Sequence, residues 1–144
     1  MLDKSDMSDM SDMLDSCCIC KICEDDPTSH SFKIVGTYNN IIYYYTCPAQ
    51  ATKYYDTKGI VNHYDLLLSS NKNKWAWIFD CKGFSSKHLL EIKVGIELAK
   101  LITSKYSDRL EKIVIINKNI YINTIIALIY PFLNTTIQNK ITIL

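Results

Sequence analysis

The stretch Trp75-Ala76-Trp77-Ile78-Phe79 is a short apolar run without polar alternation. Such runs are typical of parallel strands that are covered on both faces. A helical pattern of apolar residues precedes it over residues 57–68, where Thr57 can cap the helix. A longer helix is predicted after it, from residue 85 or 86 to about residue 106, with one apolar stripe.

The same alternation continues toward the end of the chain. Residues 113–116 predict another buried strand, and a helix opens at Asn119 or Asn123 and ends near Pro131. Residues 141–144 predict a last apolar strand.

A β-hairpin is predicted ahead of the first helix. Residues 33–38 and 41–47 are rich in β-forming residues and flank Asn39-Asn40, two residues that tolerate positive φ. The order after the hairpin is then α-β-α-β-α-β. This alternation predicts an α/β fold with a mainly parallel sheet, right-handed crossovers and helices packed on the sheet.

Residues 1–31 differ in composition from the rest of the chain. Residues 5–13 repeat Ser-Asp-Met three times, and residues 1–31 carry a net charge of −6, whereas residues 32–144 carry +7. Such a segment has little to bury, so we expect residues 1–31 to form a disordered acidic tail and residues 32–144 to form the folded domain. An anionic partner, such as an anionic membrane surface, should meet the basic domain.

Targeting signals and membrane spans are not evident. The first fifteen residues lack an apolar core, and the longest apolar stretch, residues 120–133, is shorter than a bilayer requires and is interrupted by Asn123, Thr124 and Pro131. We therefore expect a cytoplasmic protein whose six cysteines are reduced thiols.

Four of the cysteines, at positions 17, 18, 20 and 23, lie close together in the tail. Cys17, Cys18, Cys20 and Cys23 form two overlapping Cys-x-x-Cys spacings that zinc or an iron–sulfur cluster could use. A closed site would need further ligands, for which the candidates are His30, Cys47 and Cys81. We favour unpaired thiols in a flexible tail, ahead of S-acylation and of metal binding, and so expect no metal or other cofactor.

Motifs of catalysis and of nucleic-acid binding are also missing. No nucleophile elbow, phosphate-binding glycine loop or H-E-x-x-H motif is present, and the three histidines, His30, His63 and His88, have no acidic or nucleophilic neighbour at a recognisable spacing. His63 is expected at the surface or at an edge. The consecutive tyrosines at 43–45 should point to alternate faces of a strand rather than form a stacking surface. The sequence therefore favours a non-enzymatic protein that does not bind nucleic acid.

Several motifs together resemble CRAL-TRIO domains. Residues 75–85 are similar to that family's strand followed by Asp-x-x-Gly-Phe. Four further similarities follow in order: residues 105–110 to Tyr-Pro-Glu-Arg-Leu, 113–117 to a strand ending in Asn, 130–133 to Lys-Pro-Phe-Leu, and 139–141 to a Lys-Ile pair at the start of a strand.

The resemblance implies a lipid-binding function. Members of the family bind hydrophobic ligands such as phosphoinositides, retinoids and tocopherols and move them between membranes, so the chain is expected to be transiently membrane-associated. In phosphatidylinositol-transfer members, the motif acid and the lysine of the Lys-Ile pair are implicated near the headgroup. These positions fall on Asp108 and Lys140, with Arg109 as a supporting residue.

The chain also departs from the family pattern. Ser107 replaces a proline, and the family normally continues beyond the position of Leu144 with a helix that closes the pocket. The resemblance therefore implies a C-terminally truncated domain with an open apolar pocket, which a protein partner could cover. The alternative function is a protein-interaction scaffold without lipid, as in the BCH branch of the family.

Overall fold

The structure is a computed structural model and describes residues 20–144. Five strands form one sheet in the order β1-β2-β3-β4-β5. β1 is antiparallel to β2, and β2, β3, β4 and β5 run parallel to one another. The predicted α/β fold with a mainly parallel sheet is confirmed. The strands are β1 (Lys33–Tyr38), β2 (Ile41–Thr46), β3 (Lys74–Asp80), β4 (Leu110–Ile116) and β5 (Ile141–Ile143).

The predicted hairpin joins β1 to β2. Asn39 and Asn40 have φ angles of 51° and 64°, the left-handed values that a two-residue turn of this kind requires. Asparagine adopts this region more readily than most residues, which explains the turn.

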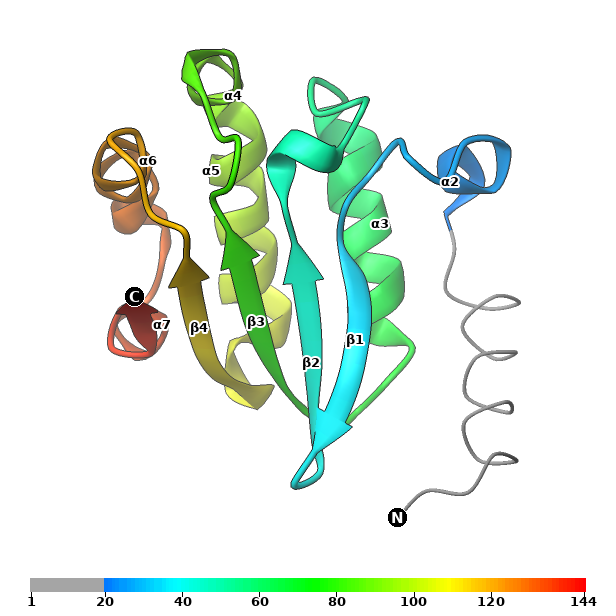
Figure 1. Ribbon diagram of the computed structural model, residues 1–144. Helices are drawn as coiled ribbons and strands as arrows, with labels where there is room; N and C mark the ends of the chain where they lie inside the picture. Colours follow the sequence, from blue (N-terminus) through cyan, green and yellow to red (C-terminus); the bar gives the residue numbers. More distant parts are fainter. Residues whose placement is uncertain (1–19) are drawn as a thin grey trace.

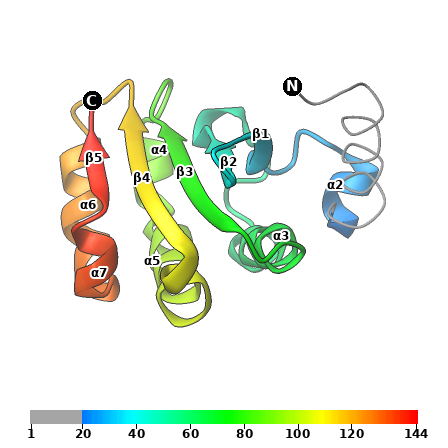
Figure 2. The same ribbon diagram turned by 90° about the horizontal axis from the view of Figure 1, so that it is seen from below.

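The helices between the parallel strands pack on one face of the sheet. α3 (Thr57–Ser69) connects β2 to β3, α4 (Ser86–Leu90) and α5 (Ile92–Leu101) connect β3 to β4, and α6 (Ile122–Ile129) and α7 (Thr135–Gln138) connect β4 to β5. In Figure 1, α3 and α5 lie behind the strands. Figure 2 shows β5 at the edge of the sheet beside β4, with α6 and α7 next to it.

One long helix was predicted over residues 85–106, and the structure divides it. α4 ends at Leu90 and α5 begins at Ile92, because the backbone of Glu91 between them (φ −89°, ψ 42°) is not helical. The last turn, Ile102–Tyr106, is a π-helix and leads into the short 3₁₀ helix Ser107–Arg109 before β4. The apolar stripe that predicted the helix continues across the break, which is why the pattern did not reveal it.

The core is aromatic where the sheet meets α3. The ring of Phe32 stacks between Tyr44 and Tyr64, with ring centroids 4.8 Å and 3.8 Å away. Tyr64 and Phe32 also contact Trp77 edge-on. Phe32 is 2% exposed, so it joins β1, β2 and α3 into one packed layer.

The segment 20–31 differs from the disordered tail that the sequence predicted. It contains the short helix α2 (Lys21–Asp25), and Cys20, Cys23, Ser29 and His30 are buried. Its backbone is tied to the domain, because Thr52 N donates to Thr28 O and Lys53 N donates to Ser29 O. The expectation of disorder was therefore wrong for residues 20–31. An acid-rich composition does not reveal that a few side chains of this segment are buried against the domain. The remaining part of the predicted tail, residues 1–19, lies outside the described residues.

No helix in residues 20–144 has the length and hydropathy needed to cross a bilayer.

Replacing Phe32 tests the aromatic core. Phe32→Ala should lower the free energy of unfolding by about 3–5 kcal/mol, because it removes a buried ring and leaves a cavity between two tyrosines. Urea denaturation measures this change. Val35→Ala, at a half-exposed position of β1, is the control and should change stability by less than about 1 kcal/mol. If the two variants lower the free energy of unfolding equally, Phe32 does not make the large contribution to core stability that its packing indicates.

Candidate functional site

An apolar pocket lies between the sheet and helices α5 and α6. Its floor is formed by side chains from one face of β3, β4 and β5, including Trp77, Ile113 and Ile141. Its walls come from α5 and α6, and Tyr54 and Leu133 complete the lining. The residues from the sheet and the two helices are Trp77, Phe79, Gly95, Leu98, Ala99, Ile102, Ile113, Ile115, Ile122, Ile125, Ile126, Ile129 and Ile141. The lining contains no charged side chain, so this pocket suits a hydrocarbon ligand.

The pocket is small because α6 closes onto it. Its volume is about 70 Å³, whereas pockets for drug-sized ligands span about 300–1,000 Å³. Helix α5 has Gly95 at the contact with α6, where an added Cβ would lie 3.1 Å from Cγ2 of Ile129. The resemblance implied an uncovered apolar pocket, and on this face of the sheet the structure differs, since Ile122 and Ile125 of α6 are buried against it.

Apolar side chains also surround α6 on its outer side. Leu128 is 47% exposed and Ile120, just before the helix, is 82% exposed. Tyr130 and Phe132, just after it, are also exposed, and Lys100 Nζ lies 5.5 Å from the centre of the Phe132 ring. Helix α6 therefore presents apolar residues both to the pocket and to the solvent.

The opposite face of the sheet carries a second apolar surface. Tyr43, Ile78 and Val114 alternate with the residues of the pocket floor and are half-buried. None of the helices of residues 20–144 lies in front of the strands in Figure 1, which looks onto this face. Lys112 Nζ lies 5.6 Å from the centre of the Tyr43 ring, so the surface is apolar with a lysine over one ring.

The predicted headgroup residues Asp108 and Lys140 lie at the same end of the parallel sheet. Asp108 is exposed and stands two residues before β4, and Lys140 directly precedes β5, which pairs with β4. Nζ of Lys140 donates to the carbonyl oxygen of Leu110, the first residue of β4. Lys140 is also the neighbour of Ile141, which lines the pocket. The ion pairs of residues 20–144 include none between Asp108, Arg109 and Lys140.

Arg109 has a different arrangement from that expected of a headgroup ligand. Its guanidinium donates to the carbonyl oxygens of Leu68 at 3.3 Å, Asn71 at 2.6 Å and Asn73 at 3.1 Å. These carbonyls belong to the end of α3 and the loop that follows it, so the side chain satisfies a helix terminus. Arg109 thereby fixes the loop that leads into β3.

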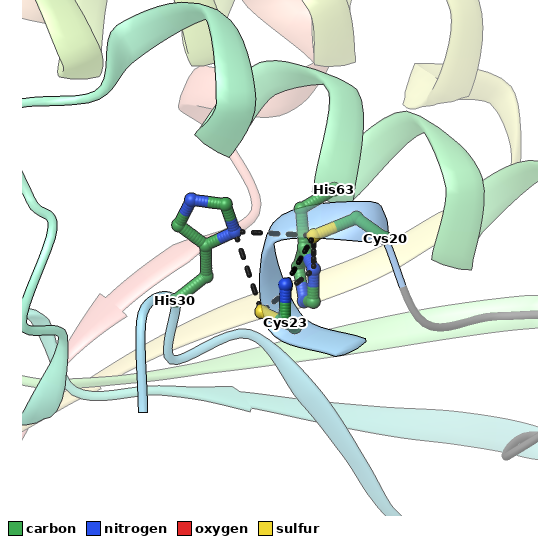
Figure 3. Close-up of side chains that lie close together, drawn as sticks. All are labelled: Cys20, Cys23, His30 and His63. Atoms are coloured by element: carbon green, nitrogen blue, oxygen red, sulfur yellow. Dashed lines mark hydrogen bonds between the residues drawn. The ribbon is translucent and has the colours of Figure 1, made fainter. Parts of the chain in front are cut away.

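A group of cysteine and histidine side chains gathers on the other side of the molecule. Cys20, Cys23, His30 and His63 are all buried, and their potential ligand atoms lie within 4.8 Å of one another (Figure 3). From the sequence, Cys20, Cys23 and His30 are among the candidate ligands of a metal site, whereas His63 is predicted at the surface or at an edge. His63 is 5% exposed, because it lies on the inner side of α3 beneath the segment 20–31. His63 lies three residues after Ile60 and four before Leu67, on the buried face of α3, and this helical spacing could have indicated its burial.

Burial controls the protonation of this group. It lowers the pKa values of both His30 and His63, although Asp56 acts in the opposite direction on His30. Burial and the neighbouring Cys20 raise the pKa of Cys23 to about 11. At neutral pH the two imidazoles are therefore neutral, and the Cys23 thiol keeps its proton unless a cation is bound.

Two comparisons with known proteins find similarities. Residues 16–144 match the protein family described as the CRAL/TRIO domain. The crystal structure of Sfh5 superposes with a TM-score of 0.65 at 16% sequence identity, over 87% of this chain and 49% of the Sfh5 chain. The chain thus spans about half the length of that protein, and the likeness concerns the fold. No curated protein sequence matches the chain significantly.

Truncating Arg109 should destabilise the domain. Arg109→Ala leaves three carbonyl groups without their charged donor, which should lower the free energy of unfolding by about 1.5–3 kcal/mol in urea denaturation. The control is Lys105→Ala, which removes an exposed ion pair of 3.4 Å with Asp65 and should cost about 0.5 kcal/mol or less. If Arg109→Ala does not change the free energy of unfolding, the arginine is not needed for stability and its side chain is available to bind a ligand.

Proposed function

The chain belongs to the CRAL/TRIO domain family, and we propose that it binds a hydrophobic lipid between its sheet and helix α6. The observation that carries this proposal is the predominantly apolar lining of the pocket, which contains no charged side chain and is shared by the sheet floor and by two helices. Each methylene of an acyl chain that leaves water for such a site contributes about 0.8 kcal/mol. A chain of ordinary length therefore supplies enough free energy for stable binding without any polar contact.

A lipid requires α6 to move away from the sheet. The pocket of about 70 Å³ is smaller than the ~150 Å³ of an engineered cavity that holds benzene. Of the residues in α6, Ile122 and Ile125 are the fully buried ones. Exposing two such side chains costs about 3–6 kcal/mol, and the acyl chain that replaces them in the pocket offsets this cost.

The outer side of α6 suits a membrane surface. Leu128, Tyr130 and Phe132 can enter the boundary between headgroups and acyl chains when the helix swings outward. Lys100 stands beside Phe132, and residues 32–144 have a net positive charge, so we propose that the docking surface is an anionic membrane. Opening at the membrane would pass the lipid between bilayer and pocket without exposing it to water.

Within this function, we propose a phosphoinositide as the ligand. Lys140 is next to Ile141 of the pocket floor, so a phosphate held by Lys140 would leave the acyl chains beside the apolar lining. The ammonium would exchange the Leu110 carbonyl for the phosphate, and the exposed Asp108 could accept hydrogen bonds from inositol hydroxyls.

Filling the pocket tests lipid binding. Ala99→Phe places a ring in the space between α5 and the sheet and should abolish uptake of a fluorescent phospholipid from vesicles, with a loss of stability of about 1–3 kcal/mol. The matched control is Ala127→Phe, which adds the same ring on the exposed side of α6 and should keep uptake. If Ala99→Phe takes up the phospholipid as well as the parent chain does, the lipid does not bind in this pocket.

Removing the ammonium of Lys140 tests the choice of lipid. Lys140→Ala should weaken binding of phosphatidylinositol phosphate by about 10–100-fold, the value of a charged hydrogen bond, while binding of diacylglycerol is retained. Lys112→Ala, a lysine on the opposite face of the sheet, is the control. If Lys140→Ala and Asp108→Ala bind the phosphoinositide as the parent does, the proposed headgroup site is wrong.

The second apolar face of the sheet favours one alternative function. Tyr43, Ile78 and Val114 form a surface that a protein partner could cover, as in a scaffold of the BCH type. A parent chain that takes up no lipid in the vesicle assay would favour this second function.

A further inference from the structure

The group of Cys20, Cys23, His30 and His63 has no part in the lipid site. Its members come from three segments: the two cysteines from the start of α2, His30 from the connection to β1, and His63 from α3. Figure 3 shows the four side chains close together, with dashed lines that join Nδ1 of each imidazole ring to the two sulfur atoms. Four soft or borderline ligand atoms thus converge on one point from segments up to 43 residues apart.

The four sulfur–nitrogen distances within the group are those of a tetrahedral metal site. Nδ1 of His30 lies 3.4 Å and 3.5 Å from the sulfurs of Cys20 and Cys23, and Nδ1 of His63 lies 3.3 Å and 3.7 Å from them. With Zn–S bonds of about 2.3 Å and Zn–N bonds of about 2.0 Å, a tetrahedron separates a sulfur ligand from a nitrogen ligand by about 3.5 Å. These four sulfur–nitrogen distances are therefore close to those that a bound zinc ion would impose, and all four ligand atoms lie within 4.8 Å of one another.

We propose that Cys20, Cys23, His30 and His63 bind one zinc ion. Two thiolates and two imidazoles are a common ligand set of structural zinc sites, and the pair of cysteines has the usual Cys-x-x-Cys spacing. The thiols lose their protons to solvent when the ion binds, and the positive ion stabilises the resulting thiolates. Because all four ligands are protein side chains, no coordination position remains for a substrate, so the site is structural.

The outer nitrogens of both histidines are held in the orientation that metal binding requires. Nε2 of His63 lies 2.7 Å from the carbonyl oxygen of Phe32 and donates to it, which leaves Nδ1 unprotonated for the ion. Nε2 of His30 lies 3.3 Å from Oδ2 of Asp56. Metal-binding histidines usually donate their second N–H to a carbonyl or a carboxylate in this way.

Asp56 and Gly59 connect the zinc group to the start of α3. Oδ1 of Asp56 accepts from the backbone N–H of Gly59 at 3.1 Å, so the same carboxylate caps the helix and orients His30. A Cβ at Gly59 would collide with this carboxylate and with Ile22 of α2. The absence of a side chain at Gly59 therefore allows α2 to lie close over the helix start.

The burial of Cys20 and Cys23 favours zinc binding over S-acylation of these thiols. Cys20 is 2% exposed and Cys23 is 6% exposed, so an acyl chain could not be attached without displacing α2. Cys47 and Cys81 are buried elsewhere and are not members of the group. In the zinc-bound chain, the ion fixes residues 20–31 to α3.

Metal analysis of the full chain tests the proposal. Chain purified from zinc-supplemented cells should contain about one zinc ion, and the cobalt-substituted chain should show the strong visible absorption of tetrahedral Co²⁺ together with thiolate charge transfer. Cys23→Ser and His63→Ala should lose the metal, while Cys47→Ser and the double variant Cys17→Ser/Cys18→Ser should keep it. Removing zinc with a chelator should lower the midpoint of thermal unfolding by on the order of 10 °C.

A conservative variant separates metal binding from simple packing. Asp56→Asn keeps a good helix cap but removes the carboxylate beside His30, so zinc affinity in a chelator competition should fall by about 10–100-fold. The proposal is overturned if the parent chain binds neither Zn²⁺ nor Co²⁺, if Cys20 and Cys23 are instead recovered as a disulfide from metal-supplemented cells, or if Cys23→Ser keeps its zinc. Unchanged affinity of Asp56→Asn would overturn the role of Asp56.

Discussion

The position of each helix follows from the sequential order of the strands in the sheet. Each parallel strand lies next to the one before it, so right-handed crossovers bring α3, α5 and α6 to the same face of the sheet. That face consequently holds the aromatic core under α3 and the apolar pocket under α5 and α6. Helix α6, in the last crossover, covers the pocket and also presents apolar residues to solvent. The proposed lipid site therefore has a crossover helix as its cover.

Much of the fold follows from the sequence because apolar periodicity reports which residues face the core. The strand at Trp75–Phe79, the Asn39-Asn40 turn and the helix that begins near Thr57 all appear where the pattern places them. The pattern did not reveal the break at Glu91, because the apolar stripe continues on both sides of it. It also missed α7, a helix of four residues capped by Asn134, since so short a segment has no measurable periodicity.

The sequence pattern also fails to predict which single residues come together in the candidate sites. The cysteine spacing was visible in the sequence, but its partner His63 lies 40 residues after Cys23, and tertiary structure alone brings the two together. Composition likewise predicted disorder up to residue 31, although two cysteines and a histidine anchor residues 20–31 to α3. Arg109 was assigned to a headgroup by its motif, whereas its three carbonyl partners belong to a loop that no motif describes.

Native mass spectrometry of the full chain, purified from a eukaryotic expression host without detergent, tests whether the space between the sheet and α6 is a lipid pocket. We expect a second species, heavier than the protein by the mass of one lipid, which disappears after solvent extraction and returns on incubation with vesicles. If the chain carries no lipid as purified, and acquires none from vesicles containing phosphatidylinositol phosphate, this space is not a lipid pocket.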